Sequence, residues 1–414
     1  MDVTVSPSKL KGEIKAPPSK SVMQRAVAAA ILCTSPTKIK NPSYCDDGLA
    51  ALEMAEQLGA RVEKGENSCT IFPNEVKAGG NLNCGESGLG SRLFTCLAAL
   101  QNHEIQVDGK GSLRNRPFSD FEMILPQLEV EFKTTNGHLP LSVKGPAKAG
   151  EIEVDASSSS QFLSGLLMIL PTLEGDSTVK VKNLKSRPYI DMTLDVMKHF
   201  GVEVENQNYE IFKIKGKQNY SASEIEIDGD WSGAAFLFVA AVVTQSELKI
   251  ASLKKNPNQG DSQIVDVLQS MGAQVKEEND SWMVSAKTLT SFEFDATNCP
   301  DLFPPLAVLA VLGNAPSKIK GVHRLKHKES DRGKVLIEML SQAGIRSEIE
   351  NDEMIIFPGK PKACTINSYN DHRIAMAAAV LGLAGEGVTI EDAEAVSKSW
   401  PGFFEDLGLL RAKI

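Results

Sequence analysis

The chain contains 414 residues and carries a formal net charge of −9 at pH 7. That length exceeds one ordinary hydrophobic core and predicts two domains of about 200 residues. The acidic balance disfavours a nucleic-acid-binding surface, and long apolar runs such as 233–243 fall well short of the roughly 20 residues that cross a bilayer. The seven cysteines lack zinc-ligand spacing, which argues against a zinc site and a disulfide framework. Residues 1–20 contain no apolar signal segment, so we expect a cytoplasmic protein.

One pattern, a polar turn followed by an apolar helix rich in small residues, occurs six times at intervals of about 70 residues. In chain order the helices begin near Lys20, Asn83, Asp155, Asp228, Asn298 and Tyr369. After each of the first five we expect a strand, a second and more amphipathic helix, and a hairpin. Each repeat is therefore predicted as helix, strand, helix, hairpin.

Turn residues support the end of each predicted repeat. Four of the second helices run into a glycine that suits a left-handed C-terminal cap, namely Gly59, Gly201, Gly272 and Gly344. The second repeat has "PQLEVEF" near Leu128 instead and lacks the glycine. In the hairpin that follows, Asn136-Gly137 is a strong signal for a two-residue turn.

The last repeat is cut short after 399–410, and the opening segment, 1–16, resembles the missing hairpin. We therefore expect both termini in one domain. The predicted domains are 1–19 plus 228–414, and 20–227, with the active site in the cleft between them. A linear solenoid is the alternative, although this period is long for such repeats.

The first turns of three of these helices carry more polar groups than a cap requires. They are Lys20, Ser21 and Arg25 in the first repeat, Ser159, Ser160 and Gln161 in the third, and Asp371, His372 and Arg373 in the sixth. Unpaired N–H groups and the helix dipole attract anions to such a turn. Capping alone needs one Ser, Thr, Asp or Asn, and added basic residues oppose the dipole. At any single turn, plain capping remains the alternative.

Further cations lie between the repeats: Arg114, Arg116, Arg187, Lys328, Arg332 and Lys398. Each alone is consistent with a solvated charge or a surface ion pair, for example between Arg332 and Glu329 or Asp331. Together they supply enough charge to bind two or three phosphate or carboxylate groups. The usual nucleotide-binding glycine loops, a GxSxG elbow and a metal-ligand pattern are absent.

Eight segments resemble the signatures of the 5-enolpyruvylshikimate-3-phosphate synthase family, in the same order. They are "PPSKSVMQR", "RNRP", "SSSSQF", "SRPYID", "CPD", "HKESDR", "NDHRIAM" and "SKSWPGF", and they extend from Lys20 to Phe403. The resemblance implies an α/β fold of two similar domains, each of three βαβαββ units arranged like an inverse α/β barrel. It implies transfer of the enolpyruvyl group of phosphoenolpyruvate to the 5-hydroxyl of shikimate 3-phosphate, with release of phosphate, no metal and no cofactor. We expect a monomer.

The resemblance also implies binding residues by matching position. For shikimate 3-phosphate they are Lys20, Ser21, Arg25, Ser159, Ser160, Gln161, Ser186, Tyr189, Asp301, Arg324 and Lys328. For phosphoenolpyruvate they are Lys20, Gly88, Arg116, Gln161, Arg332, Arg373 and Lys398. Asp301 is the implied base and Glu329 the implied acid, with Lys20 and His372 stabilising charge or relaying a proton. Physical reasoning leaves the split between the two carboxylates open, because their environments decide it.

Two positions depart from the family pattern. Glu86-Ser87-Gly88 stands where Asn-Ala-Gly is common, and Arg324 stands where Asn is common. Because Gly88 is retained, we expect glyphosate to compete with phosphoenolpyruvate. Two other functions remain as alternatives: an enolpyruvyl transferase acting on UDP-N-acetylglucosamine, which usually carries a Cys or Asp in a loop that here reads "GKGSLRNRPF", and a non-catalytic scaffold that binds anions.

Overall fold

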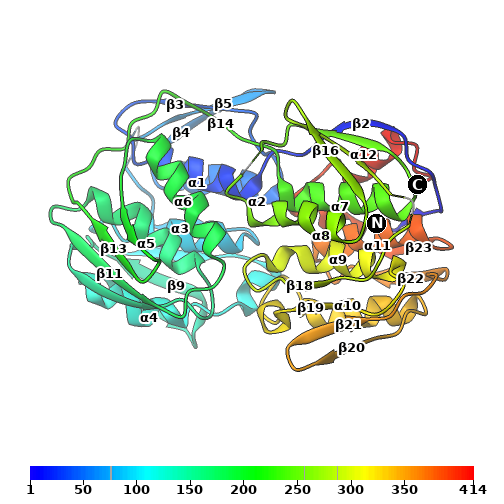
Figure 1. Ribbon diagram of the computed structural model, residues 1–414. Coiled ribbons are helices and arrows are strands. Elements are labelled where there is room, and N and C mark those ends of the chain that lie inside the picture. Colours follow the sequence, from blue (N-terminus) through cyan, green and yellow to red (C-terminus); the bar gives the residue numbers. More distant parts are fainter. Residues whose placement is uncertain (75–76, 256, 287) are drawn as a thin grey trace. The chain divides into compact units, whose positions relative to one another are not determined.

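The computed structural model describes residues 1–74, 77–255, 257–286 and 288–414. The chain divides into two compact units. Unit 1 consists of Met1–Pro17 and Asp228–Ile414, and unit 2 consists of Pro18–Ile227. Both are built from small sheets and helices that alternate along the chain (Figure 1).

Three four-stranded sheets account for the strands of unit 2 in the described residues. The first, in spatial order, contains β14 (Glu224–Glu226), β3 (Thr37–Lys40), β5 (Ser68–Phe72) and β4 (Arg61–Lys64). The second contains β6 (Asn81–Asn83), β7 (Ile105–Asp108), β9 (His138–Lys144) and β8 (Glu131–Thr135). The third contains β10 (Glu151–Asp155), β11 (Ser177–Lys182), β13 (Ile211–Ile214) and β12 (Glu205–Gln207).

Unit 1 has two sheets of four strands and one of three over the same described ranges. The first contains β2 (Gly12–Lys15), β15 (Leu248–Ala251), β17 (Ser281–Ser285) and β16 (Gln274–Glu278). The second contains β18 (Glu293–Asp295), β19 (Ser317–Lys320), β21 (Glu353–Ile356) and β20 (Ser347–Glu350). The third contains β22 (Cys364–Asn367), β23 (Val388–Glu391) and β1 (Val3–Val5).

Every four-stranded sheet follows one pairing rule. Its first two strands are parallel, as in the register of β10 with β11, and a hairpin then adds two antiparallel strands. In three of these sheets a helix connects the parallel pair, because consecutive parallel strands need a crossover: α3 (Gly88–Ala98) joins β6 to β7, α5 (Gln161–Ile169) joins β10 to β11, and α9 (Phe303–Leu309) joins β18 to β19. A second helix then leads to the hairpin. This is the βαβαββ unit, so the predicted fold class is confirmed.

The first helix of each repeat forms the core of its unit. In unit 2 these helices are α1 (Lys20–Ala30), α3 (Gly88–Ala98) and α5 (Gln161–Ile169); in unit 1 they are α7 (Trp231–Val243), α9 (Phe303–Leu309) and α11 (His372–Ala384). Within each unit they pack against one another, and α7 is buried along its whole length. Small residues allow the close approach: a Cβ on Gly165 of α5 would collide with the Arg92 carbonyl and the Cys96 sulfur of α3.

The second helices are α2 (Asp46–Gln57), α4 (Ser119–Ile124), α6 (Arg187–His199), α8 (Ile264–Ser270), α10 (Arg332–Gln342) and, in the last repeat, α12 (Phe403–Leu409). The four predicted cap glycines all have positive φ, from 75° to 100°, which confirms the glycine stops. Where the glycine is missing, Glu129 takes the left-handed conformation at φ 60°. The turn at Asn136-Gly137 joins β8 to β9 with both residues at positive φ, as predicted.

The opening strands do not form the hairpin that the sequence suggested. β1 pairs antiparallel with β23 and completes the sheet of the last repeat, whereas β2 pairs parallel with β15 in the sheet of the fourth repeat. β14, which precedes the fourth repeat in sequence, pairs instead with β3 of the first repeat. The hairpin prediction is therefore wrong, because β2 and β14 have exchanged sheets.

Candidate active site

The entrance of α1 is charged, and its lysine has a carboxylate partner. Ser19 caps the helix by accepting a hydrogen bond from the Val22 N–H. Lys20 is 9% exposed, and its ammonium lies 2.9 Å from Asp47 Oδ2 in the first turn of α2. Ser19 therefore caps the helix, and the Lys20 side chain is paired with α2.

Arg25 links two helices of unit 2. It is 1% exposed and donates to Thr193 Oγ1 at 2.8 Å, to the Tyr189 carbonyl at 3.0 Å and to the Ser21 carbonyl at 2.8 Å. Burial lowers the pKa of its guanidinium to about 10. Arg25 therefore fixes the N-terminal turn of α1 to the start of α6, where Ser186 and Tyr189 lie.

Gly88 and Arg116 are in direct contact. Gly88 begins α3, and a Cβ placed there would overlap the Arg116 guanidinium. A side chain at this position would therefore displace the Arg116 guanidinium. The Glu86 carboxylate lies instead over Gly111, where a Cβ would collide with it. The Glu86 side chain, which departs from the family pattern, therefore lies against the 3₁₀ helix Gly111–Asn115.

The polar turn before α5 is a compact group. Ser159 Oγ accepts the Gln161 N–H at 3.2 Å, and Ser160 is 4% exposed. Gln161 Oε1 is a buried oxygen without a hydrogen-bond donor. At the start of α6, Ser186 is buried with φ 58°. Such strain persists where the surrounding structure enforces it, often at binding sites.

In unit 1 the predicted base lies among three cations. Asp301, in the 3₁₀ helix Pro300–Leu302, accepts from Arg332 Nη1 at 2.8 Å and from Arg373 Nη2 at 3.0 Å. Lys328 Nζ is 3.5 Å from the same carboxylate. These positive charges favour the ionised form of Asp301.

Arg332, the first residue of α10, joins three carboxylates. Besides Asp301 it contacts Glu329 Oε2 at 2.6 Å and both oxygens of Asp371, at 2.8 and 3.1 Å. Its side chain is 1% exposed. Burial lowers the pKa of Arg332, but the charges of Asp371, Glu329 and Asp301 outweigh that effect and raise it.

The other cations of this cluster respond differently. Burial lowers the pKa of Lys328. The negative charge of Asp301 acts to raise this pKa, whereas the positive charges of Arg332 and Arg324 lower it further. Burial also acts to lower the pKa of Arg373, but the Asp301 charge reverses the shift and the pKa is raised. Arg324 belongs to the 3₁₀ helix Val322–Leu325, and its effect on Lys328 places it electrostatically close to the cluster.

His372 and Lys398 lie beside the start of α11. His372 Nδ1 is 3.8 Å from Asp371 Oδ1 and the side chain is 1% exposed. Lys398 Nζ donates to the Asn370 carbonyl at 2.6 Å. Asp371 caps α11 through the Arg373 N–H, at 3.0 Å.

The structure thus joins Asp301, Lys328, Glu329, Arg332 and Arg373 in one network of unit 1. Sequence reasoning treated Asp371 only as part of a polar helix start and missed that it holds Arg332. It also missed Asp47, the partner of Lys20, although the acidic pair "DD" that opens the second helix is a visible signal.

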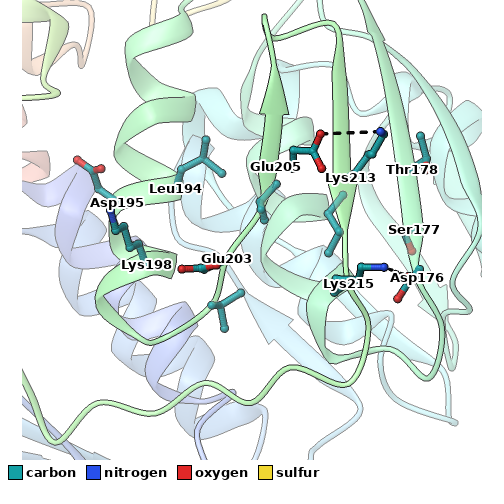
Figure 2. A pocket seen from close by; sticks show the side chains of 13 residues that line it. Asp176, Ser177, Thr178, Leu194, Asp195, Lys198, Glu203, Glu205, Lys213 and Lys215 are labelled. Carbon is teal, nitrogen blue, oxygen red and sulfur yellow. Dashed lines mark hydrogen bonds and ion pairs between the residues drawn. The ribbon is translucent and has the colours of Figure 1, made fainter.

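A separate cavity in unit 2 contains none of the predicted site residues. It has a volume of about 730 Å³ and is walled by α6 and by the strands β11 and β13. Figure 2 shows two of its ion pairs, Lys215 with Asp176 at 2.8 Å and Lys213 with Glu205 at 3.8 Å. Because these charges are paired with one another, the cavity has no concentration of positive charge to bind a polyanion.

Two features bear on ligands and membranes. Among the described residues, no group of three or more His, Cys, Asp or Glu side chains is placed to hold a metal ion. None of the helices in the described part of the chain has the length and hydrophobicity of a transmembrane span.

Solved structures share this fold over the whole chain. An EPSP synthase from Acinetobacter baumannii matches with a TM-score of 0.85 and 25% identity, covering 99% of this chain and 98% of that one. The enolpyruvyl transferase NikO from Streptomyces tendae matches with a TM-score of 0.80 at 17% identity, covering 100% and 97%. The fold is that of the enolpyruvyl transferases.

Sequence comparison identifies the branch of this class. The profile of EPSP synthase (3-phosphoshikimate 1-carboxyvinyltransferase) matches residues 5–407. Curated 3-phosphoshikimate 1-carboxyvinyltransferases from Clostridium kluyveri and Pyrococcus abyssi are 38% and 39% identical, covering 100% and 96% of this chain and 98% and 94% of theirs. The chain belongs to the EPSP synthase family and transfers the enolpyruvyl group of phosphoenolpyruvate to shikimate 3-phosphate, a step of aromatic amino-acid biosynthesis.

Proposed function

We propose that the predicted residues of both units serve this one reaction. Lys20, Gly88, Arg116, Gln161, Arg332, Arg373 and Lys398 bind phosphoenolpyruvate. Lys20, Ser21, Arg25, Ser159, Ser160, Gln161, Ser186, Tyr189, Asp301, Arg324 and Lys328 bind shikimate 3-phosphate. The enzyme acts as a monomer in the cytoplasm and uses no metal or organic cofactor.

The charge of both substrates supports this assignment. Phosphoenolpyruvate carries a phosphate and a carboxylate, and planar guanidinium groups match both in two-point contacts. Arg332 and Arg373 each contact Asp301. An incoming anion would share these guanidinium groups with the carboxylates already present.

Asp301 is the proposed base for the 5-hydroxyl of shikimate 3-phosphate. The cations around it keep the carboxylate ionised and thus able to accept a proton. Its contacts with Arg332 and Arg373 also fix its orientation, which is the main requirement for a general base. Addition of the 5-hydroxyl oxygen to phosphoenolpyruvate gives a tetrahedral intermediate, which then releases phosphate.

Glu329 is the proposed acid for the methylene carbon. Its carboxylate now lies 2.6 Å from Arg332, which favours the ionised form. A phosphate bound to Arg332 would draw on the same guanidinium and add negative charge nearby, and both effects favour protonation of Glu329. Lys20 and His372 stabilise developing charge or relay a proton.

The observation that carries the proposal is the double anchoring of Asp301 by Arg332 and Arg373. We expect Asp301→Ala to lower kcat by about a hundredfold to ten-thousandfold, with much smaller changes in the KM of either substrate. Phosphate release and mass spectrometry of the enolpyruvyl ether measure turnover and product.

The matched control is Asp295→Asn, because Asp295 is an exposed acid of the same unit that pairs with Lys320 at 3.4 Å. This variant should keep normal turnover. Near-normal turnover of Asp301→Ala would remove Asp301 from the mechanism. Release of phosphate with UDP-N-acetylglucosamine, but not with shikimate 3-phosphate, would overturn the substrate assignment.

A further inference from the structure

Asp261 is a buried acid that the catalytic assignment does not use. It lies in the 3₁₀ helix Gly260–Gln263, just before α8. The neighbouring Gln259 fastens this segment to the start of α7: its Nε2 donates to the Gly229 carbonyl at 2.9 Å, and its Oε1 accepts the Trp231 N–H at 2.9 Å. The position of Asp261 relative to α7 is therefore well defined.

The carboxyl group of Asp261 is incompletely satisfied. The residue is 3% exposed, and Oδ2 accepts a short hydrogen bond from the Ser232 hydroxyl. The other oxygen, Oδ1, is buried without a hydrogen-bond donor. An ionised carboxylate in such a place loses its hydration with only one donor in return, which strongly favours the neutral form.

The titratable groups that interact electrostatically with Asp261 belong to three other parts of unit 1. Asp230 caps α7, Cys299 and Asp301 flank Pro300, and Arg373 lies in the first turn of α11. Burial and, next, the Asp301 charge raise the pKa of Asp261 to about 7, against the opposing charge of Arg373. The Asp261 charge in turn acts to raise the pKa of Arg373, and its effect is smaller than those of Asp301 and Arg332.

We propose that Asp261 is a positioning residue that carries a proton in the resting enzyme. Because the protonated side chain has no negative charge, it does not compete with the substrate anion for the Arg373 guanidinium, which binds phosphoenolpyruvate. This inference rests on the proposed role of Arg373. In the protonated state Arg373 is directed by Asp301 and keeps its remaining N–H groups and charge for the substrate anion. Loss of the Asp261 proton adds a negative charge beside the place where an anion must bind.

The proposal predicts a pH-dependent affinity for phosphoenolpyruvate. As the pH rises through about 7, Asp261 ionises, and the KM for phosphoenolpyruvate should rise by about tenfold, the size expected for one buried charge acting on another a few side chains away. Asp261→Asn cannot ionise and should lack this rise. The KM for shikimate 3-phosphate should follow the same course in both proteins.

The experiment compares KM and kcat of the wild type and Asp261→Asn from about pH 5.5 to about pH 8.5. The ratio of the two KM values at each pH removes the titration of phosphoenolpyruvate itself. The matched control is Asp406→Asn: Asp406 is a half-buried acid of unit 1 whose pKa is likewise raised by burial, but its carboxylate accepts a hydrogen bond from Trp400 Nε1. The KM ratio of this control should stay constant with pH.

The outcomes separate the two proposals. A wild type that releases no phosphate would contradict the proposed function. An active wild type whose KM profile runs parallel to that of Asp261→Asn would overturn only the role of Asp261. If Asp261→Asn does not fold, Ser232→Ala replaces it: without the hydroxyl donor the Asp261 proton is held more tightly, so the rise in KM should move to higher pH, and an unmoved rise would overturn the inference.

Discussion

Asp371 is fully buried, accepts two hydrogen bonds from Arg332 and caps α11. Replacing it by Ala removes a cap and leaves the buried Arg332 guanidinium without its bidentate partner. We expect this variant to lower the stability of unit 1 far more than the loss of an ordinary cap.

The expected loss of stability has two contributions, the lost cap and the lost ion pair. Loss of an N-terminal cap costs about 1 kcal/mol. Removing one partner of a buried ion pair costs about 3–5 kcal/mol, because the remaining charge is stranded; Arg332 retains Asp301 and Glu329, which places the total near the lower end. Asp371→Asn keeps an oxygen for the Arg373 N–H and should lose less than Asp371→Ala.

Asp331→Ala is the matched control, since Asp331 caps α10 through Lys334 N–H but its side chain is 31% exposed. It should cost only about 1 kcal/mol. Tryptophan fluorescence during urea unfolding is a suitable assay, because all three tryptophans, Trp231, Trp282 and Trp400, belong to unit 1. If Asp371→Ala loses no more stability than Asp331→Ala, Arg332 does not depend on Asp371 and the reasoning fails.

Two further predictions concern substrate affinity and pH. Gly88→Ala should raise the KM for phosphoenolpyruvate, because the added Cβ overlaps the Arg116 guanidinium. Loss of one charge-assisted hydrogen bond corresponds to a rise of about tenfold or more. Initial-rate kinetics with an unchanged KM would contradict this prediction. The raised pKa of Asp261 makes its contribution to stability fullest below about pH 4, and that contribution, up to about 4 kcal/mol, is lost as the pH rises through about 7. Urea unfolding at several pH values should show this loss in the wild type but not in Asp261→Asn.

The helix starts were predictable because their signals are local. Ser19 and Asp230 precede apolar runs and do cap α1 and α7, and the cap glycines end helices with the positive φ that their position demands. Such features depend on a few consecutive residues, which a sequence displays directly.

The exchange of β2 and β14 has no local signal. These strands have four and three residues, and their partners β15 and β3 lie about 200 residues away in the chain.

The site residues were also only partly predictable, for the same reason. The cations were predictable by type, but the role of Asp371 depends on Arg332, 39 residues earlier, and Asp261 reads as an ordinary turn residue until burial is known.

The placement of β2 has a consequence for the order of folding during synthesis. Residues 12–15 leave the ribosome before unit 2, but their partner strand at 248–251 follows only after the whole of unit 2 has been made. Unit 2 is continuous in sequence and can complete its sheets, β14 included, while the opening segment waits. Strand β2 therefore joins the fold late although it is made early, and the Ser6 N–H meets the Lys413 carbonyl only after both units have been made.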